Sequence, residues 1–214
     1  MRTMWGVIGL LVSGAAVASP WSISVGLGSA IPANARSGAQ AETATTAAAC
    51  GCTVFGQADA RAVVGSLGVG YRVNRWVALA AAGFGGGSFQ ESLTLTGSGI
   101  TAPATIRDHI AGGYILAEAH HRFAGRWSWA AGAGLAVTRD SESGSITVNG
   151  TTTAFPAVSN TRVSAALAAS VSYAFTRRWS MGAAYVEIPT VGRQGRQYTA
   201  GPLGLASVTA TYRF

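Results

Sequence analysis

The chain has 214 residues, of which 49% are hydrophobic and only 11% are charged, with 29 glycines and a formal net charge of +7. Ordinary soluble domains hold about 25% charged residues and about 7% glycine. The composition excludes intrinsic disorder, which needs high charge and few apolar residues, and the length fits one domain rather than a multidomain enzyme. The arginines are scattered singly, without an aromatic-interleaved basic surface, so no nucleic-acid partner is predicted.

Residues 1–18 predict a secretory signal peptide. Arg2 supplies an early charge, an apolar run covers Met4 to Val12, and Ala16-Val17-Ala18 forms an A-x-A cleavage site. This run is much shorter than the roughly 20 residues that a membrane-spanning helix requires. We therefore expect an exported mature chain, residues 19–214, without a spanning helix.

Two cysteines, Cys50 and Cys52, flank Gly51 in a predicted loop over 31–60. Export permits disulfides, and we expect a local loop disulfide between them, although so small a ring is strained. Free thiols are the alternative. A metal site would need further ligands, and the three histidines lie far away in the sequence, so neither a metal nor a cofactor is predicted.

One short pattern recurs at 71–76, 121–127 and 173–179: a ring residue, an apolar residue, a polar turn with arginine, and then tryptophan. This is an internal repeat of hairpin units. The last three residues repeat the first half of the pattern with no turn after it. Three turns and one terminal half-pattern indicate four strands arriving at one side, and eight strands in total.

Segments between these turns alternate with period two, as in 21–28, 63–73, 127–138 and 163–175. One face is apolar and the other is small or polar. A soluble sandwich would alternate too, but here the aromatic residues collect at the short-turn ends, as an interfacial girdle requires. The girdle residues are Tyr71, Trp76, Trp127, Tyr173 and Trp179. The prediction is an all-β, eight-stranded antiparallel up-and-down transmembrane β-barrel over 19–214.

The turns at the opposite end are long, with predicted loops over 31–60, 87–108 and 139–161. The runs Leu93-Thr94-Leu95-Thr96 and Ser145-Ile146-Thr147-Val148 within two of them favour hairpins that extend above the membrane. Arg193 and Arg196, in a fourth loop, would face the phosphorylated outer leaflet, so lipopolysaccharide contact is one interpretation. The other interpretation is that these arginines are ordinary loop charges in contact with solvent.

The last strand carries the most specific likeness. Val208, Ala210, Tyr212 and Phe214 form its outward row, and the chain resembles the small outer-membrane barrels of the OmpA/OmpX and opacity-protein type. Thr209 stands where that family often has glycine. The resemblance implies a Gram-negative outer membrane, contact with lipid and lipopolysaccharide, and recognition of Tyr212 and Phe214 by the barrel-assembly machinery. A monomer is expected.

The predicted lumen carries charge near the short-turn end: Glu118, His120, Arg72, Arg122 and Arg213. A carboxylate in a narrow lumen needs a cationic partner, so we predict a structural ion-pair network in which Glu118 contacts one or more of these arginines. No serine lies two residues from a histidine on one strand, so catalysis is not predicted. Two functions remain: a structural or surface-interaction protein with an unidentified surface or host ligand, and a small-solute or ion channel with a narrow polar lumen.

Overall fold

The computed structural model describes residues 19–33, 43–44, 47–48, 51–59, 61–97, 99–191 and 201–214. The predicted signal peptide, Cys50, Arg193 and Arg196 lie outside these residues. Within them, no helix is long and apolar enough to cross a membrane.

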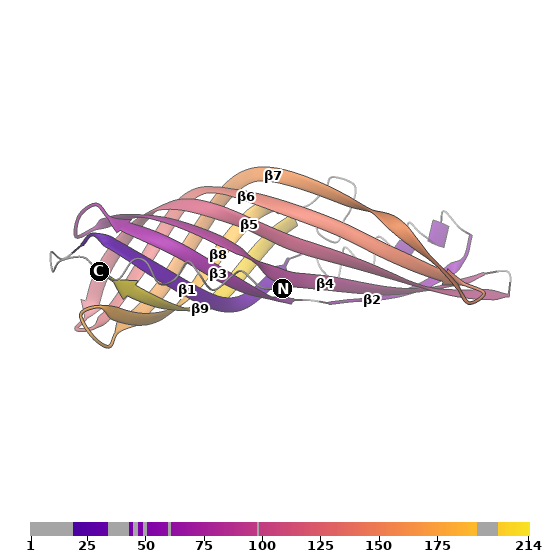
Figure 1. Ribbon diagram of the computed structural model, residues 1–214, viewed down its shortest axis with the longest axis horizontal. Helices are drawn as coiled ribbons and strands as arrows, with labels where there is room; N and C mark the ends of the chain where they lie inside the picture. The colour runs from indigo at the N-terminus through magenta and orange to yellow at the C-terminus, as the bar shows by residue number, and fades with distance from the viewer. Residues whose placement is uncertain are drawn as a thin grey trace, which may run out of the picture.

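Eight antiparallel strands close into a ring in which each strand pairs with the ring strand before and after it in the chain (Figure 1). The last strand pairs with the first from Ser22↔Arg213 to Pro32↔Leu203, which closes the ring. The predicted eight-stranded up-and-down barrel is confirmed. The ring strands are β1 (Trp21–Pro32), β3 (Ala62–Arg72), β4 (Val77–Gly97), β5 (Ile100–Ala124), β6 (Trp127–Val148), β7 (Thr151–Ala174), β8 (Trp179–Val191) and β9 (Gly201–Arg213).

The outer surface of the ring is apolar. Val25, Leu27, Leu67, Ile115 and Val163 point outward and are each more than half exposed. Water would penalise such a band of large aliphatic side chains, whereas lipid accommodates it. The band therefore marks the membrane-spanning part of the barrel.

Short turns close one end of the ring at 73–76, 125–126 and 175–178, as the repeated pattern predicts. In the first turn, Asn74 Oδ1 accepts hydrogen bonds from the backbone N–H groups of Trp76 (2.8 Å) and Val77 (2.9 Å). In the third, Thr176 Oγ1 accepts one from the N–H of Trp179 (2.9 Å). Short polar side chains thus satisfy the turn backbone locally.

The opposite end differs from the loops predicted over 87–108 and 139–161. These segments are mostly strand: β4 pairs with β5 as far as Gly97↔Ile100, and β6 with β7 as far as Val148↔Thr151. The interpretation of extended hairpins is correct. Asn149 and Gly150 form the second tip with positive φ angles of 49° and 80°, the conformation that an Asn-Gly hairpin turn requires.

A ninth strand, β2 (Thr53–Ala58), lies within the segment predicted as a loop over 31–60 and outside the ring. It pairs with β4 from Thr53↔Thr96 to Ala58↔Glu91. The pairing of β3 with β4 ends at Gly65↔Gly85, so the rest of β4 has a free edge that β2 occupies. An exposed strand edge is a template for such pairing.

The half of the lumen nearer the extended hairpins holds the main hydrophobic core. A bulge between Phe84 and Gly87 changes the alternation of β4, with Gly86 at a φ of 96°, so that Phe84 and Phe89 both point inward. Opposite Phe84, glycine is required at 112, because a Cβ there would clash with the backbone carbonyl oxygen of Val137 and would lie 2.9 Å from Phe84 Cζ. The buried cluster comprises Ala30, Ala62, Val64, Phe84, Phe89, Ile110, Leu116, Ala136, Ala166, Val186, Ile188, Leu203 and Leu205.

Replacing Phe89 with alanine should destabilise the barrel, because Phe89 is 1% exposed and its loss leaves a cavity in this core. We expect a decrease of about 3–5 kcal/mol in the free energy of unfolding, measured by urea titration of the refolded barrel in lipid vesicles. The same substitution at Phe55, which is 69% exposed on β2, is the matched control and should have a much smaller effect. Equal losses in both variants would contradict an apolar core in the lumen.

Candidate functional site: the lumen at the short-turn end

Between the apolar core and the short turns the lumen is hollow. A cavity of about 580 Å³ is lined by residues from all eight ring strands and reaches the short-turn end at Ser19, Arg75 and Trp76. It extends away from the short turns as far as Ala82 and Tyr114, and the Tyr114 ring lies 6.4 Å from that of Phe84 in the apolar core. The space exists because the inward positions here are mostly serine, alanine, glycine and threonine, whose side chains do not fill the ring.

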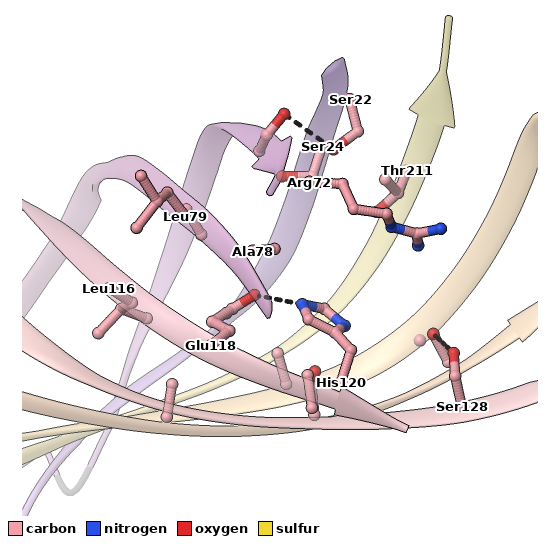
Figure 2. Close-up of a pocket in the computed structure, with 18 of the residues that line it drawn as sticks. Ser22, Ser24, Arg72, Ala78, Leu79, Leu116, Glu118, His120, Ser128 and Thr211 are labelled. Carbon is pink, nitrogen blue, oxygen red and sulfur yellow. Dashed lines mark hydrogen bonds and ion pairs between the residues drawn. The ribbon is translucent and has the colours of Figure 1, made fainter. Parts of the chain in front are cut away.

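Glu118 and His120 lie on the inward face of β5 and contact each other. His120 Nε2 lies 3.1 Å from Glu118 Oε2, and both side chains are largely buried, at 30% and 20% exposed (Figure 2). Residues two apart in a strand share a face, which brings the pair together. On the next two strands, β6 and β7, the hydroxyls of Ser128 and Ser172 hydrogen bond at 2.9 Å.

The predicted direct contact between Glu118 and an arginine is not formed. Among the described residues no guanidinium lies within 4.0 Å of the Glu118 carboxylate, which contacts His120 Nε2 instead. The register explains why: Arg72 is opposite Ala78, which is opposite Glu118, so two strand spacings of about 5 Å separate their backbones. In Figure 2 the Arg72 side chain extends toward Thr211 on β9 instead.

The three predicted lumen arginines do share the cavity. Arg72, Arg122 and Arg213 all line it. Arg213 is partly buried, and the positive charges of Arg72 and Arg122 act on its guanidinium. The short-turn end of the lumen is therefore a cluster of like charges that surround one carboxylate–histidine pair.

Aromatic residues ring the same end on the outside. Three tryptophan–tyrosine pairs stand directly opposite each other on neighbouring strands, with ring centroids 4.9–5.0 Å apart: Trp21–Tyr71, Trp127–Tyr173 and Trp179–Tyr212. Such cross-strand pairs stabilise a sheet beyond their burial. Trp76 differs, since it stacks on His121 at 5.7 Å. Trp21 and His121 also belong to this girdle and were not predicted, although Trp21 follows the outward alternation of residues 21–28.

The terminal residues take part in ring closure. The Phe214 N–H donates to the carbonyl of Trp21 (3.3 Å), and the Phe214 carbonyl accepts from the N–H of Ser19 (3.1 Å). Tyr212 contacts the Phe214 ring at 5.2 Å and accepts a hydrogen bond from Arg178 Nη1 (3.2 Å). The residues predicted as an assembly signal thus lie at the seam between β1 and β9.

Three further acidic side chains are buried toward the extended hairpins, at and beyond the level of Phe89 and Ile110, and were not identified from the sequence. Glu91, Asp108 and Asp140 are 1%, 5% and 7% exposed. Extending the alternation from Glu118 back along β5 reaches Asp108, and the alternation of β6 reaches Asp140, so that signal was present. The buried position of Glu91 could not be counted along β4, because the bulge between Phe84 and Gly87 changes the alternation. These three carboxylates lie toward the extended hairpins, whereas Arg72, Arg122 and Arg213 lie near the short turns.

Cys52 is disulfide-bonded in the structure. It packs beside Val54 and Leu93 in a small second hydrophobic cluster outside the ring. Within the described residues, no group of three or more histidine, cysteine or acidic side chains could hold a metal ion.

No family model and no curated protein matches the sequence. Solved barrels match the structure over nearly the whole chain. OprG from Pseudomonas aeruginosa, an outer membrane protein, has 10% identity and a TM-score of 0.50, covering 92% of this chain and 96% of that one. Neisserial surface protein A has 14% identity and a TM-score of 0.49, covering 92% and 98%. The N-terminal barrel domain of Pseudomonas aeruginosa OprF has 14% identity and a TM-score of 0.45, also covering 92% and 98%.

At these identities the likeness concerns the fold. The chain has the fold of the small eight-stranded outer-membrane β-barrels of the OmpA/OmpX type. Its closed antiparallel ring with an apolar outer band is the architecture of a protein embedded in the Gram-negative outer membrane.

Replacing Glu118 with glutamine should leave the lumen arginines without their nearest negative charge. We expect the free energy of unfolding at low ionic strength to fall by about 1–2 kcal/mol, and a second substitution, R213Q, to restore part of the loss by reducing the repulsion. Denaturant titrations of the three proteins measure this coupling. The control is E187Q, since Glu187 faces away from the lumen cavity. Additive effects of E118Q and R213Q would contradict an electrostatic link between them.

Proposed function

We propose that this outer-membrane barrel holds a rigid β-sheet above the membrane for contact with other surfaces. The observation that supports the proposal is the continuation of β4, β5, β6 and β7 past the ring, joined by β2 (Figure 1). The strands β2-β4-β5-β6-β7 form one five-stranded sheet there. From Ser88 to Gly97, β4 alone extends by roughly 30 Å at about 3.3 Å per residue.

The extension has a hydrophobic core of its own. Val54, Leu93 and Ala104 are buried together, and Leu95, Ile106 and Ile146 pack against them. An isolated two-stranded hairpin is marginally stable in water, whereas several paired strands with a packed face are stable. The extension is therefore built as an ordered platform rather than as a set of loose loops.

The platform exposes residues suited to contact. Residues 151–159 of β7 are all exposed, including Phe155 and Val158, each at 46%, and Phe55 on β2 is 69% exposed. The pairing of β7 with β8 begins only at Leu167, so within the described residues this part of β7 has β6 on one side alone. Exposed aromatic and aliphatic side chains on a free strand support recognition of another macromolecule.

The channel alternative has less support. The hollow part of the lumen ends at Ala82 and Tyr114, and beyond them lies the buried cluster that contains Phe84, Phe89 and Ile110. Ions do not cross a packed apolar layer readily, because they would have to leave their hydration water. This favours a surface-interaction role, without catalysis, over conduction.

Shortening the β4–β5 hairpin tests the proposal. Replacing residues 90–107 with Asn-Gly keeps the opposed pair Phe89 and Asp108 beside a two-residue turn, and removes the edge on which β2 pairs. Gram-negative cells that express the shortened barrel should attach several-fold less well to fixed epithelial monolayers, and to one another, than cells that express the full chain.

The control is N149D, which changes one tip residue and keeps a turn-forming Asp-Gly pair. Heat-modifiable mobility on gels verifies that all three barrels are folded and present in equal amounts. Attachment that is unchanged by the shortening, at equal barrel levels, would contradict the proposed role.

A further inference from the structure

We propose that the cavity at the short-turn end of the lumen is a binding site for a dianionic phosphate group, reached from the periplasmic side. The inference is independent of the surface role of the extended hairpins. It rests on the charge of the cavity, on its hydroxyl groups and on its one closed end.

The charge of the cavity is out of balance. Arg72, Arg122 and Arg213 line it, and Glu118 is the one carboxylate among its described lining residues. In the described part of the chain none of the three guanidinium groups has an ion-pair partner within 4.0 Å, since Glu118 contacts His120. The cavity therefore has a surplus of two positive charges, before Arg75 at its rim is counted.

A dianion matches this surplus. A phosphate monoester carries about −1.5 to −2 charges at pH 7, and guanidinium groups bind its oxygens with paired hydrogen bonds. Arg72, Arg122 and Arg213 come from three different strands, so they can approach one group from several sides. A bound dianion would also relieve the repulsion that Arg72 and Arg122 exert on Arg213.

The remaining lining supplies neutral donors. Hydroxyl groups from six strands line the cavity: Ser22 and Ser24 on β1, Tyr114 on β5, Ser128 on β6, Ser170 and Ser172 on β7, Ser180 on β8, and Thr209 and Thr211 on β9. Ser22 donates to the Gly70 carbonyl, and Ser128 and Ser172 bond to each other, so these three would exchange those bonds for bonds to a ligand. In Figure 2 the Arg72 side chain points toward Thr211, and both residues line the cavity. Phosphate oxygens accept several hydrogen bonds at once, and this mixture of donors suits them.

The shape of the cavity sets the direction of entry. The volume of about 580 Å³ lies within the range of small-molecule sites. The apolar core closes the end of the cavity nearer the extended hairpins, while Ser19, Arg75 and Trp76 line the end at the short turns. Short turns of outer-membrane barrels face the periplasm. The ligand is thus either a soluble phosphate monoester of the periplasm or the phosphate monoester headgroup of an inner-leaflet lipid such as phosphatidic acid.

Calorimetric titration with inorganic pyrophosphate tests the site, using the full mature barrel in neutral detergent at constant ionic strength. We expect saturable binding to the wild-type protein and at least about a tenfold loss of affinity in R72Q/R213Q, equivalent to about 1.4 kcal/mol. The charge-matched control is R126Q/R177Q, whose exposed arginines lie in the short turns outside the cavity. Its affinity should stay within about twofold of wild type.

E118Q provides a test in the opposite direction. It removes the negative charge that competes with the ligand, so the affinity for pyrophosphate should rise, whereas a variant that merely misfolds would lose affinity. Equal losses in the cavity and control variants, no binding to wild type beyond the effect of ionic strength, or an unchanged affinity in E118Q would each overturn the proposal.

Lipid composition distinguishes the two sources of phosphate. In nanodiscs of phosphatidylcholine alone, pyrophosphate should bind as in detergent. If added phosphatidic acid, a phosphate monoester, weakens pyrophosphate binding to wild type and to R126Q/R177Q more than the monoanionic diester phosphatidylglycerol does at equal surface charge, the site takes a lipid headgroup. If phosphatidic acid has no such effect, the site takes a soluble phosphate monoester.

Discussion

Backbone hydrogen bonding in lipid is the constraint on which the rest of this structure depends. A strand in the hydrocarbon core cannot leave N–H and C=O groups unpaired, so the sheet must close on itself. Here the closing seam is the pairing of β1 with β9, extended to the terminal residue by the hydrogen bonds of Phe214. Once the ring is closed, alternate residues must face lipid, and the period-two pattern of the sequence follows from that requirement.

Closure also fixes how narrow the lumen is, and the sequence fills it in two different ways. Toward the extended hairpins, bulky apolar side chains such as Phe89 and Ile188 pack as in the core of a soluble protein, and buried acidic residues lie beside them. Toward the short turns, small residues leave a cavity that is lined by arginines. Eight strands can enclose a packed interior, but the two halves have different consequences, since the packed half gives stability and the hollow half can hold a ligand.

Much of this arrangement is encoded locally. The repeated turn pattern before Trp76, Trp127 and Trp179 is enough to count the ring strands, and alternation is enough to point Glu118 inward. What could not be predicted depends on distant partners. Strand β2 forms because β4 continues beyond the last residue that pairs with β3 and so leaves a free edge. Nothing in the composition of residues 53–58 indicates that this edge exists.

Two further features needed three-dimensional information. The bulge at Gly85 and Gly86 changes the alternation of β4, so the inward positions of Phe89 and Glu91 cannot be counted from the turn. The partner of Glu118 depends on how far each side chain reaches across the ring. His120, two residues away on the same face, is nearer than an arginine on another strand, which simple charge pairing does not reveal.

The central claim is that an apolar core closes the lumen, and single-channel recording in planar bilayers tests it most directly. The wild-type barrel should insert without discrete conductance steps, because the cluster around Phe84, Phe89 and Ile110 leaves no aqueous path. A variant with serine at these three positions serves as the positive control and should show steps under the same voltage. Reproducible steps from the wild-type barrel, at the size given by the serine variant, would contradict the account.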